Sequence, residues 1–295
     1  MIGSFRVRSS DQGARPTAIP AKKTMTSMLD QIFGRFFSSQ WIVFPIVVIL
    51  LVGISELAWR IGIARGQKKS EADKDSGIVR SAVLALLGLL LGFSFAIAAA
   101  RHEARREFLV EEANSIRTTA RRAQLLPEPH GANVTALLRE YVPLRIQAHR
   151  EAQFADQFAI TRKRSAELQD RIWAEAVAAA AERPSPITAS FITSLNETID
   201  LEGKRIAAKR NHVPGAVWLL LLCVAGCGLW LVGYQAGTSG RRSALDRFVF
   251  PVLVAIVIVL ITDIDTPRGG LISLDERPLL ELNESLSHAS TKTAP

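Results

Sequence analysis

Cysteine is scarce in this chain, at two of 295 residues. A small secreted domain held together by disulfide bonds needs several cysteine pairs, so that class of protein is excluded. The two cysteines, Cys223 and Cys227, have no histidine or further cysteine near them in the sequence. We therefore interpret them as small packing residues rather than metal ligands.

Motifs of catalysis and cofactor binding are also missing. The five histidines are scattered, and no two of them have the spacing of a metal site. No phosphate-binding Walker loop and no Gly-x-Ser-x-Gly motif occurs. The sequence thus predicts no catalytic residue, no metal site and no cofactor. An enzyme is the least supported class of function.

Charge is nearly absent from four long windows of the sequence, at 41–59, 81–100, 215–236 and 248–262, where Glu56 is the single charged residue. A helix of about 20 residues crosses the roughly 30 Å of hydrocarbon in a bilayer. The first three windows have this length and the fourth is somewhat shorter. The pattern predicts four transmembrane helices.

The residues between the second and third windows are strongly charged and lack strand patterns. Neither glycine nor proline interrupts residues 93–126, so the second span should continue into water as one helix that ends before Pro127. Further helices are predicted from the capping candidate Asn133, over 165–182, and from the N-cap Ser185 up to Pro214.

These patterns predict an all-α membrane protein with four transmembrane helices and a helical soluble domain inserted between spans two and three. The expected segments are a disordered basic N-tail (1–40), spans one and two (41–100), the soluble helical domain (101–214), spans three and four (215–262) and an acidic C-tail (263–295).

The net charge of +8 is spread over segments that flank the apolar windows. This distribution favours a lipid bilayer as the partner and argues against nucleic acid. The two short loops, between spans one and two and between spans three and four, are rich in Lys and Arg, which favours the cytoplasmic side for them. With four spans the N-tail lies on the opposite side from these loops, so that orientation would place the basic N-tail outside the cytoplasm. We expect a multi-pass protein of the cell inner membrane, with the tails and the soluble domain in the cytoplasm.

Small residues recur at every fourth position of the second window, at Gly88, Gly92 and Ala96. Such a stripe lets another helix approach closely. Together with Ser94, these residues are candidates for a packing face or for the wall of a pore. Three arginines follow at the end of the window, and at a narrow mouth they would attract anions; they are Arg101, Arg105 and Arg106.

A second candidate site combines Glu112 and Asn114 of the helix extension with Asp263, Asp265 and Arg268 after the fourth window. In the structural interpretation, these residues form a buried polar clamp that joins the second helix to the C-terminal segment.

The same segments carry a family resemblance. They are the run Leu-Gly-Leu-Leu-Leu-Gly-Phe-Ser-Phe-Ala at 87–96, the basic 101–106, the polar 111–116, Leu-Leu-Pro at 125–127, the Asp-rich 263–272 and Pro-Leu at 278–279. In combination and order these segments resemble the bacterial bestrophin-like domain family of four-span membrane proteins. The family name implies an anion channel like the true bestrophins, which are oligomers whose second span lines the pore.

Two functions therefore stay open. The favoured one is a non-enzymatic helical membrane scaffold that forms a homo-oligomer. The alternative is a bestrophin-like anion channel that passes chloride or another small anion, with span two lining the pore.

Overall fold

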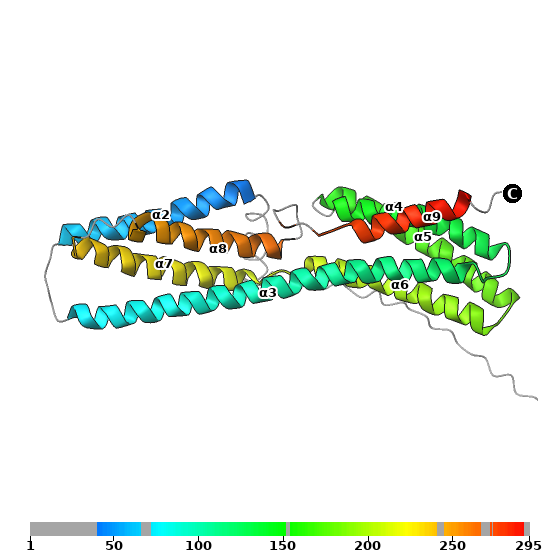
Figure 1. Cartoon of the computed structure of the whole chain (residues 1–295), viewed down its shortest axis with the longest axis horizontal. Helices are drawn as coiled ribbons and strands as arrows, with labels where there is room; N and C mark the ends of the chain where they lie inside the picture. Colours follow the sequence, from blue (N-terminus) through cyan, green and yellow to red (C-terminus); the bar gives the residue numbers. More distant parts are fainter. Residues whose placement is uncertain are drawn as a thin grey trace, which may run out of the picture.

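The computed structural model describes residues 40–65, 72–151, 154–240, 245–266, 272 and 274–291. The predicted N-tail, apart from its last residue, and Arg268 lie outside the described residues. The described part contains helices and no strand, so the predicted all-α fold is confirmed for it. Its helices form two bundles that lie end to end along the long axis of the molecule (Figure 1).

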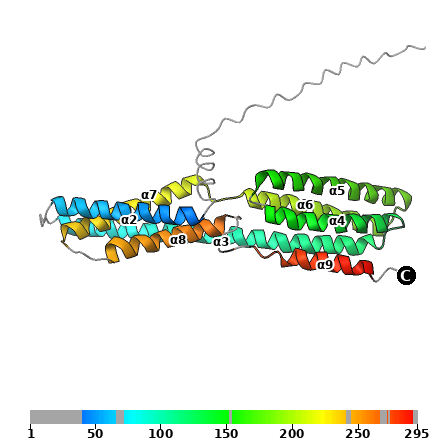
Figure 2. The ribbon, with the colours of Figure 1, turned by 90° about the horizontal axis from the view of Figure 1, so that it is seen from above.

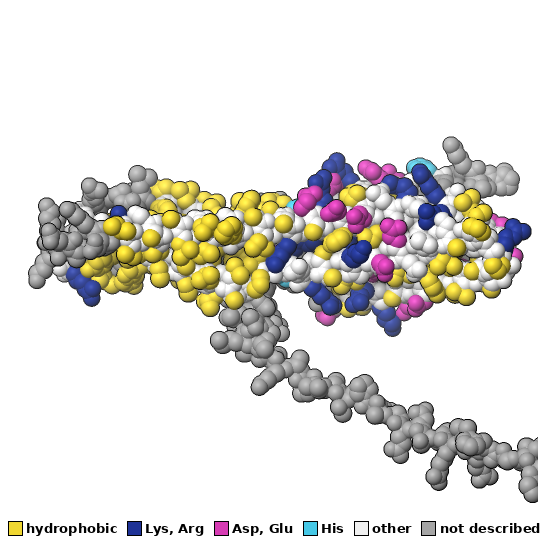
Figure 3. Space-filling view, turned by 90° about the horizontal axis from the view of Figure 1, so that it is seen from below, with side chains coloured by type: hydrophobic (Ala, Val, Ile, Leu, Met, Phe, Trp, Pro, Cys, Tyr) yellow, Lys and Arg dark blue, Asp and Glu magenta, His cyan; other side chains and the backbone are white. Residues whose placement is uncertain are grey.

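One bundle is apolar on its surface as well as in its interior. It contains α2 (Gln40–Arg65), the first half of α3 (Ala72–Ala123), α7 (Gly215–Thr238) and α8 (Phe250–Asp265), which follows the short π-helix η2 (Leu245–Val249). Hydrophobic side chains dominate its surface in Figure 3. Among the described residues, four helices are long and apolar enough to cross a membrane. The chain is thus a multi-pass membrane protein, as predicted.

The other bundle contains the second half of α3 together with α4 (His130–Arg150), α5 (Ala155–Glu182), α6 (Pro186–Arg210) and α9 (Arg277–Thr291). Charged side chains of both signs are scattered over its surface in Figure 3. Its interior is an apolar core that includes Ile116, Leu138, Ile172 and Phe191. We call this bundle the polar half and the first one the membrane half.

Helix α3 runs without a break through both halves, as Figures 1 and 2 show. Its 52 residues correspond to a length of about 80 Å at 1.5 Å per residue. The sequence predicts this continuity, because proline is absent from the helix and its last glycine is Gly92. The predicted end before Pro127 is confirmed.

The three further helices predicted for the soluble domain correspond to α4, α5 and α6, and two of them begin earlier than predicted. Helix α6 begins as predicted, with Ser185 and Thr188 in a reciprocal capping box. Helix α4 begins at His130 rather than after Asn133, whose side chain instead donates a hydrogen bond to Glu175 on α5. Helix α5 begins ten residues before the predicted Ser165. A mostly polar first part hides the start of α5 from a search for apolar periodicity.

Helix α9 is not predicted by the sequence analysis, which describes this region as an acidic tail. Its apolar residues Leu279, Leu282 and Leu286 are spaced three and four apart, and all three are buried in the core of the polar half. Arg139 on α4 donates a hydrogen bond to the carbonyl oxygen of Leu286, 3.0 Å away. The C-terminal segment is thus part of the polar half.

Glycines bring α2 and α7 into close contact in the membrane half. A Cβ atom added to Gly237 would overlap the carbonyl oxygen of Trp59, and one added to Gly233 would overlap the carbonyl oxygen of Ser55. A Cβ atom on Gly62 would likewise overlap the backbone of α7. Backbone contact of this kind is typical of small residues between membrane helices. Within the chain, this glycine contact joins α2 to α7 rather than involving the predicted stripe on α3.

We therefore expect Gly237→Ala to destabilise the protein by about 1–3 kcal/mol, because the added methyl group must push two backbones apart. Gly53→Ala in α2 is the matched control, since its new Cβ would have no atom within 4 Å. Thermal unfolding in detergent measures the difference. Equal melting temperatures for the two variants would show that the helices can separate without cost.

At the other end of the molecule, His130 joins α4 to α5. Its Nδ1 lies 2.7 Å from Glu175 Oε2 and its Nε2 lies 3.3 Å from Glu182 Oε2. The hydrogen bond to Glu175, with the negative charge of both carboxylates, raises the pKa of His130 above its ordinary value of 6.5. The protonated imidazolium is therefore favoured in the folded state.

A group whose pKa is raised by folding stabilises the protein at low pH, and this contribution is lost as the pH rises through the folded-state pKa. The wild type should accordingly be more stable than His130→Gln at pH 5.5, and the difference should shrink above pH 6.5. Thermal unfolding across that range tests this expectation. A difference that is constant with pH would mean that folding does not raise the pKa of His130.

Candidate functional site

The predicted small-residue stripe lies on a face of α3 that no other described part of the chain covers. Ser81, Ala85, Gly88, Gly92 and Ala96 are all exposed. A Cβ atom added to Gly88 or Gly92 would have no atom within 4 Å. Within the described part of one chain, these residues therefore have no packing partner. The face is free to meet lipid, another copy of the chain or a water-filled path.

Ser94 lies on the other side of the helix. Its side chain is buried at 4% exposure, in the same row as Leu87 and Ala98, which belong to the core of the membrane half. Residues two apart on a helix are separated by about 200°, so Ser94 cannot share a face with Gly92. The four predicted residues thus divide into an exposed set and a buried serine.

The exposed face of α3 continues into the polar half and changes in character there. In the membrane half the face consists of small, uncharged residues, and in the polar half it carries side chains of both charges. The exposed residues of the polar part include Glu103, Arg106, Glu107, Val110, Asn114 and Arg121. Asn114 accepts a hydrogen bond from Arg117 one turn away, at 3.1 Å. Asn114 therefore belongs to this exposed face rather than to a buried clamp.

The junction between the two halves is built on Arg105. Its guanidinium donates to the carbonyl oxygens of Ile264 at 2.7 Å and Asp265 at 2.8 Å. These carbonyls are among the last of α8, where helix hydrogen bonds end and the helix dipole is negative. Arg105 thus caps α8 from α3, and its side chain is only 4% exposed.

Two aspartates complete the junction. Asp265 accepts a hydrogen bond from the backbone N–H of Val213, at 2.9 Å, and its other oxygen lies 3.6 Å from Nη1 of Arg101. Asp263 accepts a hydrogen bond from the N–H of Ile272, at 3.1 Å. Both carboxylates are buried, and they hold the segments on either side of the boundary between the halves. The predicted partner Arg268 lies outside the described residues.

Glu112 lies in a different cluster, inside the polar half. It is fully buried and forms ion pairs with Arg145 of α4, at 2.8 Å, and with Arg205 of α6. Arg145 also contacts Glu202 of α6, at 2.6 Å. The four side chains balance two negative charges with two positive ones and connect three helices. The set predicted as one clamp is therefore separated into a junction and this inner network.

Hydrogen bonds extend the inner network to a fourth helix. The hydroxyl of Tyr141 donates to Glu202 at 3.0 Å and accepts from Gln169 of α5 at 2.9 Å. Burial raises the pKa of Tyr141, so its phenol is neutral at physiological pH. In the network each carboxylate is paired with at least one guanidinium group. No group of side chains that could hold a metal ion occurs among the described residues. The network therefore has the arrangement of a structural connection between the four helices.

Sequence reasoning did not identify Arg145, Glu202 or Arg205, although a signal is present. Each residue occupies a position of an apolar stripe, as Arg145 does four residues after Tyr141 and seven after Leu138. A charge in such a position must be paired when the helix packs. Opposite charges on the apolar stripes of three helices are thus the pattern that could have revealed the network.

We expect Glu112→Ala to destabilise the protein by about 3–5 kcal/mol, because it leaves two buried guanidinium groups without their shared carboxylate. Glu111→Ala is the matched control, since Glu111 is the exposed neighbour on the same helix. Chemical or thermal unfolding in detergent measures both. A loss of equal size in the two variants would contradict a buried network.

The fold of this chain is similar to that of solved bacterial proteins. A crystal structure of a bacterial bestrophin homologue from Klebsiella pneumoniae superimposes with a TM-score of 0.58 at 18% identity, covering 84% of this chain and 100% of that one. A point variant of that homologue gives 0.59 at 16% identity, covering 83% and 99%. These likenesses concern the fold.

A comparison with curated proteins finds no match. The sequence model of the Bestrophin-like domain, in contrast, matches residues 48–279, which is most of the chain. This match includes α3, the junction and the inner network. The chain therefore belongs to the bestrophin-like domain family.

Proposed function

We propose that several copies of this chain assemble in the membrane into an anion-conducting pore, with the exposed face of α3 lining the path. The observation that carries this proposal is the open face itself. The membrane part of α3 is the least buried of the four candidate spans, with 17% of its most apolar window buried, compared with 50% for α8. An oligomer with α3 at its centre would give this face a role.

The side chains on the face suit a narrow path. Gly88, Gly92 and Ala96 leave room between helices that approach one axis, and they offer weakly polar backbone rather than bulky groups. The continuous helix would carry the same path onward into the polar half, where the face becomes charged. An ion on this path would then enter or leave next to the charged side chains of the polar half.

Chloride or another small anion is the substrate that the family resemblance implies. The arginines expected at the mouth support this only in part, because Arg105 is buried against α8 and Arg101 is paired with Asp265. Arg106 is exposed, and its Nη1 lies 3.4 Å from Oε1 of Glu103. The fixed charge of the face is therefore mixed, and Arg106 is the residue of the three that can meet a passing anion.

The same engaged arginines favour a second candidate, a non-conducting scaffold. In that function the face of α3 would serve only for contact between copies. For either function we propose the inner membrane as the location, with the polar half in the cytoplasm. The two candidates differ in one measurable property, which is ion flux.

Purified protein in liposomes should pass chloride in preference to potassium. Gly92→Phe should reduce the flux about tenfold or more, because the ring fills a narrow path while the open space around Gly92 lets the chain fold normally. Leu86→Phe is the matched control, since Leu86 is exposed on a different side of α3. Flux through this variant should be close to that of the wild type.

An intact oligomer must be verified in the same vesicles by cross-linking. Absence of flux from an intact oligomer would overturn the channel and leave the scaffold. Flux that Gly92→Phe does not reduce would show that the path lies elsewhere than along this face.

A further inference from the structure

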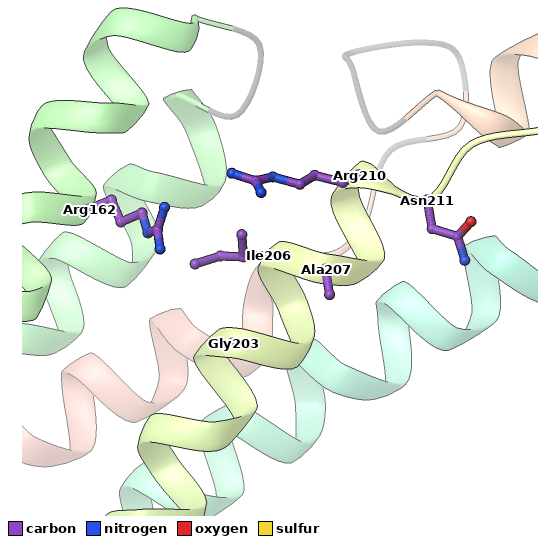
Figure 4. Close-up of a pocket in the computed structure, with 6 residues that line it drawn as sticks. All are labelled: Arg162, Gly203, Ile206, Ala207, Arg210 and Asn211. Carbon is purple, nitrogen blue, oxygen red and sulfur yellow. The ribbon is translucent and has the colours of Figure 1, made fainter. Parts of the chain in front are cut away.

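A groove of about 500 Å³ opens on the surface of the polar half, away from the junction and the inner network. Six residues line it, namely Arg162, Gly203, Ile206, Ala207, Arg210 and Asn211. Arg162 belongs to α5, and the other residues belong to the last two turns of α6 and the residue after it. Figure 4 shows the groove between these two helices.

Two guanidinium groups extend into this groove from different helices. In Figure 4, Arg162 and Arg210 both point into the space beside Ile206. Both side chains are exposed, and neither forms a hydrogen bond or an ion pair with another described residue. Two positive charges that face one space without a carboxylate between them repel each other. An anion bound between them would remove that repulsion.

Phosphate is the anion that this arrangement fits best. Arginine presents several N–H donors in a planar fork that matches phosphate oxygens, and a phosphate group can accept from two such forks at once. Asn211 lies at the end of the groove and adds an amide group. Ile206 and Ala207 provide an apolar wall that can contact the carbon atoms attached to the phosphate.

The groove lies close to the start of the membrane half. Helix α6 ends at Arg210, and the apolar helix α7 begins at Gly215, only a short linker later. Arg210 therefore lies at the boundary between the polar half and the membrane half. Phospholipid headgroups are found at this depth.

We propose that Arg162 and Arg210 form a binding site for a phosphate group, presented either by an anionic phospholipid or by a soluble phosphate ester. The position at the boundary favours the phospholipid. The site is separate from the face of α3 and does not depend on whether the protein conducts ions.

Gly203 permits a test of the groove that leaves its charge unchanged. A Cβ atom on Gly203 would have no atom within 4 Å, so a larger side chain fits without moving the helix. Gly203→Leu should therefore fill the groove and leave both arginines in place. The double variant Arg162→Gln/Arg210→Gln removes the charges and leaves the groove open.

The matched control for charge is the double variant Arg171→Gln/Arg183→Gln. Arg171 and Arg183 are exposed, lie in the second half of α5 and directly after it, and belong neither to the groove nor to the face of α3. This control removes the same net charge at a distance from the groove. A general attraction of the basic protein for anions would respond equally to both double variants.

Retention of phosphatidylglycerol and of phosphatidylcholine by the intact protein in neutral detergent can be measured by native mass spectrometry. Binding of glycerol 3-phosphate can be measured by calorimetry. The wild type should retain phosphatidylglycerol in preference to phosphatidylcholine. Both groove variants should weaken this retention about tenfold or more, because two charge-assisted contacts are lost or blocked, and the control should not.

If glycerol 3-phosphate binds with the same dependence on the groove and phosphatidylglycerol does not, the site is supported with a soluble ligand. Retention of both probes that is equal in the wild type and the groove variants would overturn the site. Equal loss in the control variant would also overturn it, by showing a general effect of charge. None of these results depends on ion flux.

Discussion

The unbroken hydrogen-bond ladder of α3 is the constraint on which both halves of the molecule depend. In the membrane a helix must satisfy its backbone N–H and C=O groups by internal hydrogen bonds. Helix α3 continues the same hydrogen bonds through the polar half, where water could bind these groups instead. Helices α7 and α8 pack on its first half, and α2 packs in turn against those two. Helices α4, α6 and α9 pack on its second half, and α5 packs against α4 and α6 (Figures 1 and 2). A break near the boundary would interrupt the continuous helix that the two bundles share.

Two sets of buried charges secure the packing on α3, and they work in different ways. At the junction, Arg105 satisfies the carbonyl groups that every helix leaves open at its C-terminal end, so α8 can end inside the protein. In the inner network, Glu112 is shared by two arginines from two helices. Such groups are costly to bury unless all of them are paired, so each pair fixes the relative positions of its helices.

The contacts of α3 leave one of its faces uncovered in the membrane half. The packing of α3 uses one side of the helix and leaves the side with Gly88 and Gly92 uncovered along the membrane half. The tight glycine contact of the chain lies instead between α2 and α7, where backbone meets backbone. Small residues thus have two different environments in this protein, and those on α3 are available to an assembly of several chains.

The sequence by itself determined the helical class, the four spans, the continuity of α3 and the start of α6, because these follow from local rules. Apolar length, the absence of proline from α3, and the N-cap Ser185 followed by Pro186 are local signals that act over a few residues. The early start of α5 and the burial of α9 were missed because their apolar residues are few and are completed by other helices.

Only the tertiary structure decided which charges meet. Glu112 and Asp263 are both acidic residues beside apolar segments, yet one pairs with α4 and α6 and the other binds a backbone N–H near the C-terminal segment. Likewise, Arg101, Arg105 and Arg106 are neighbours in sequence, but the helical turn directs Arg105 into the protein and Arg106 outward. Partners 33 to 160 residues apart are selected by the packing of whole helices, and that selection depends on the burial of entire faces rather than on any local pattern.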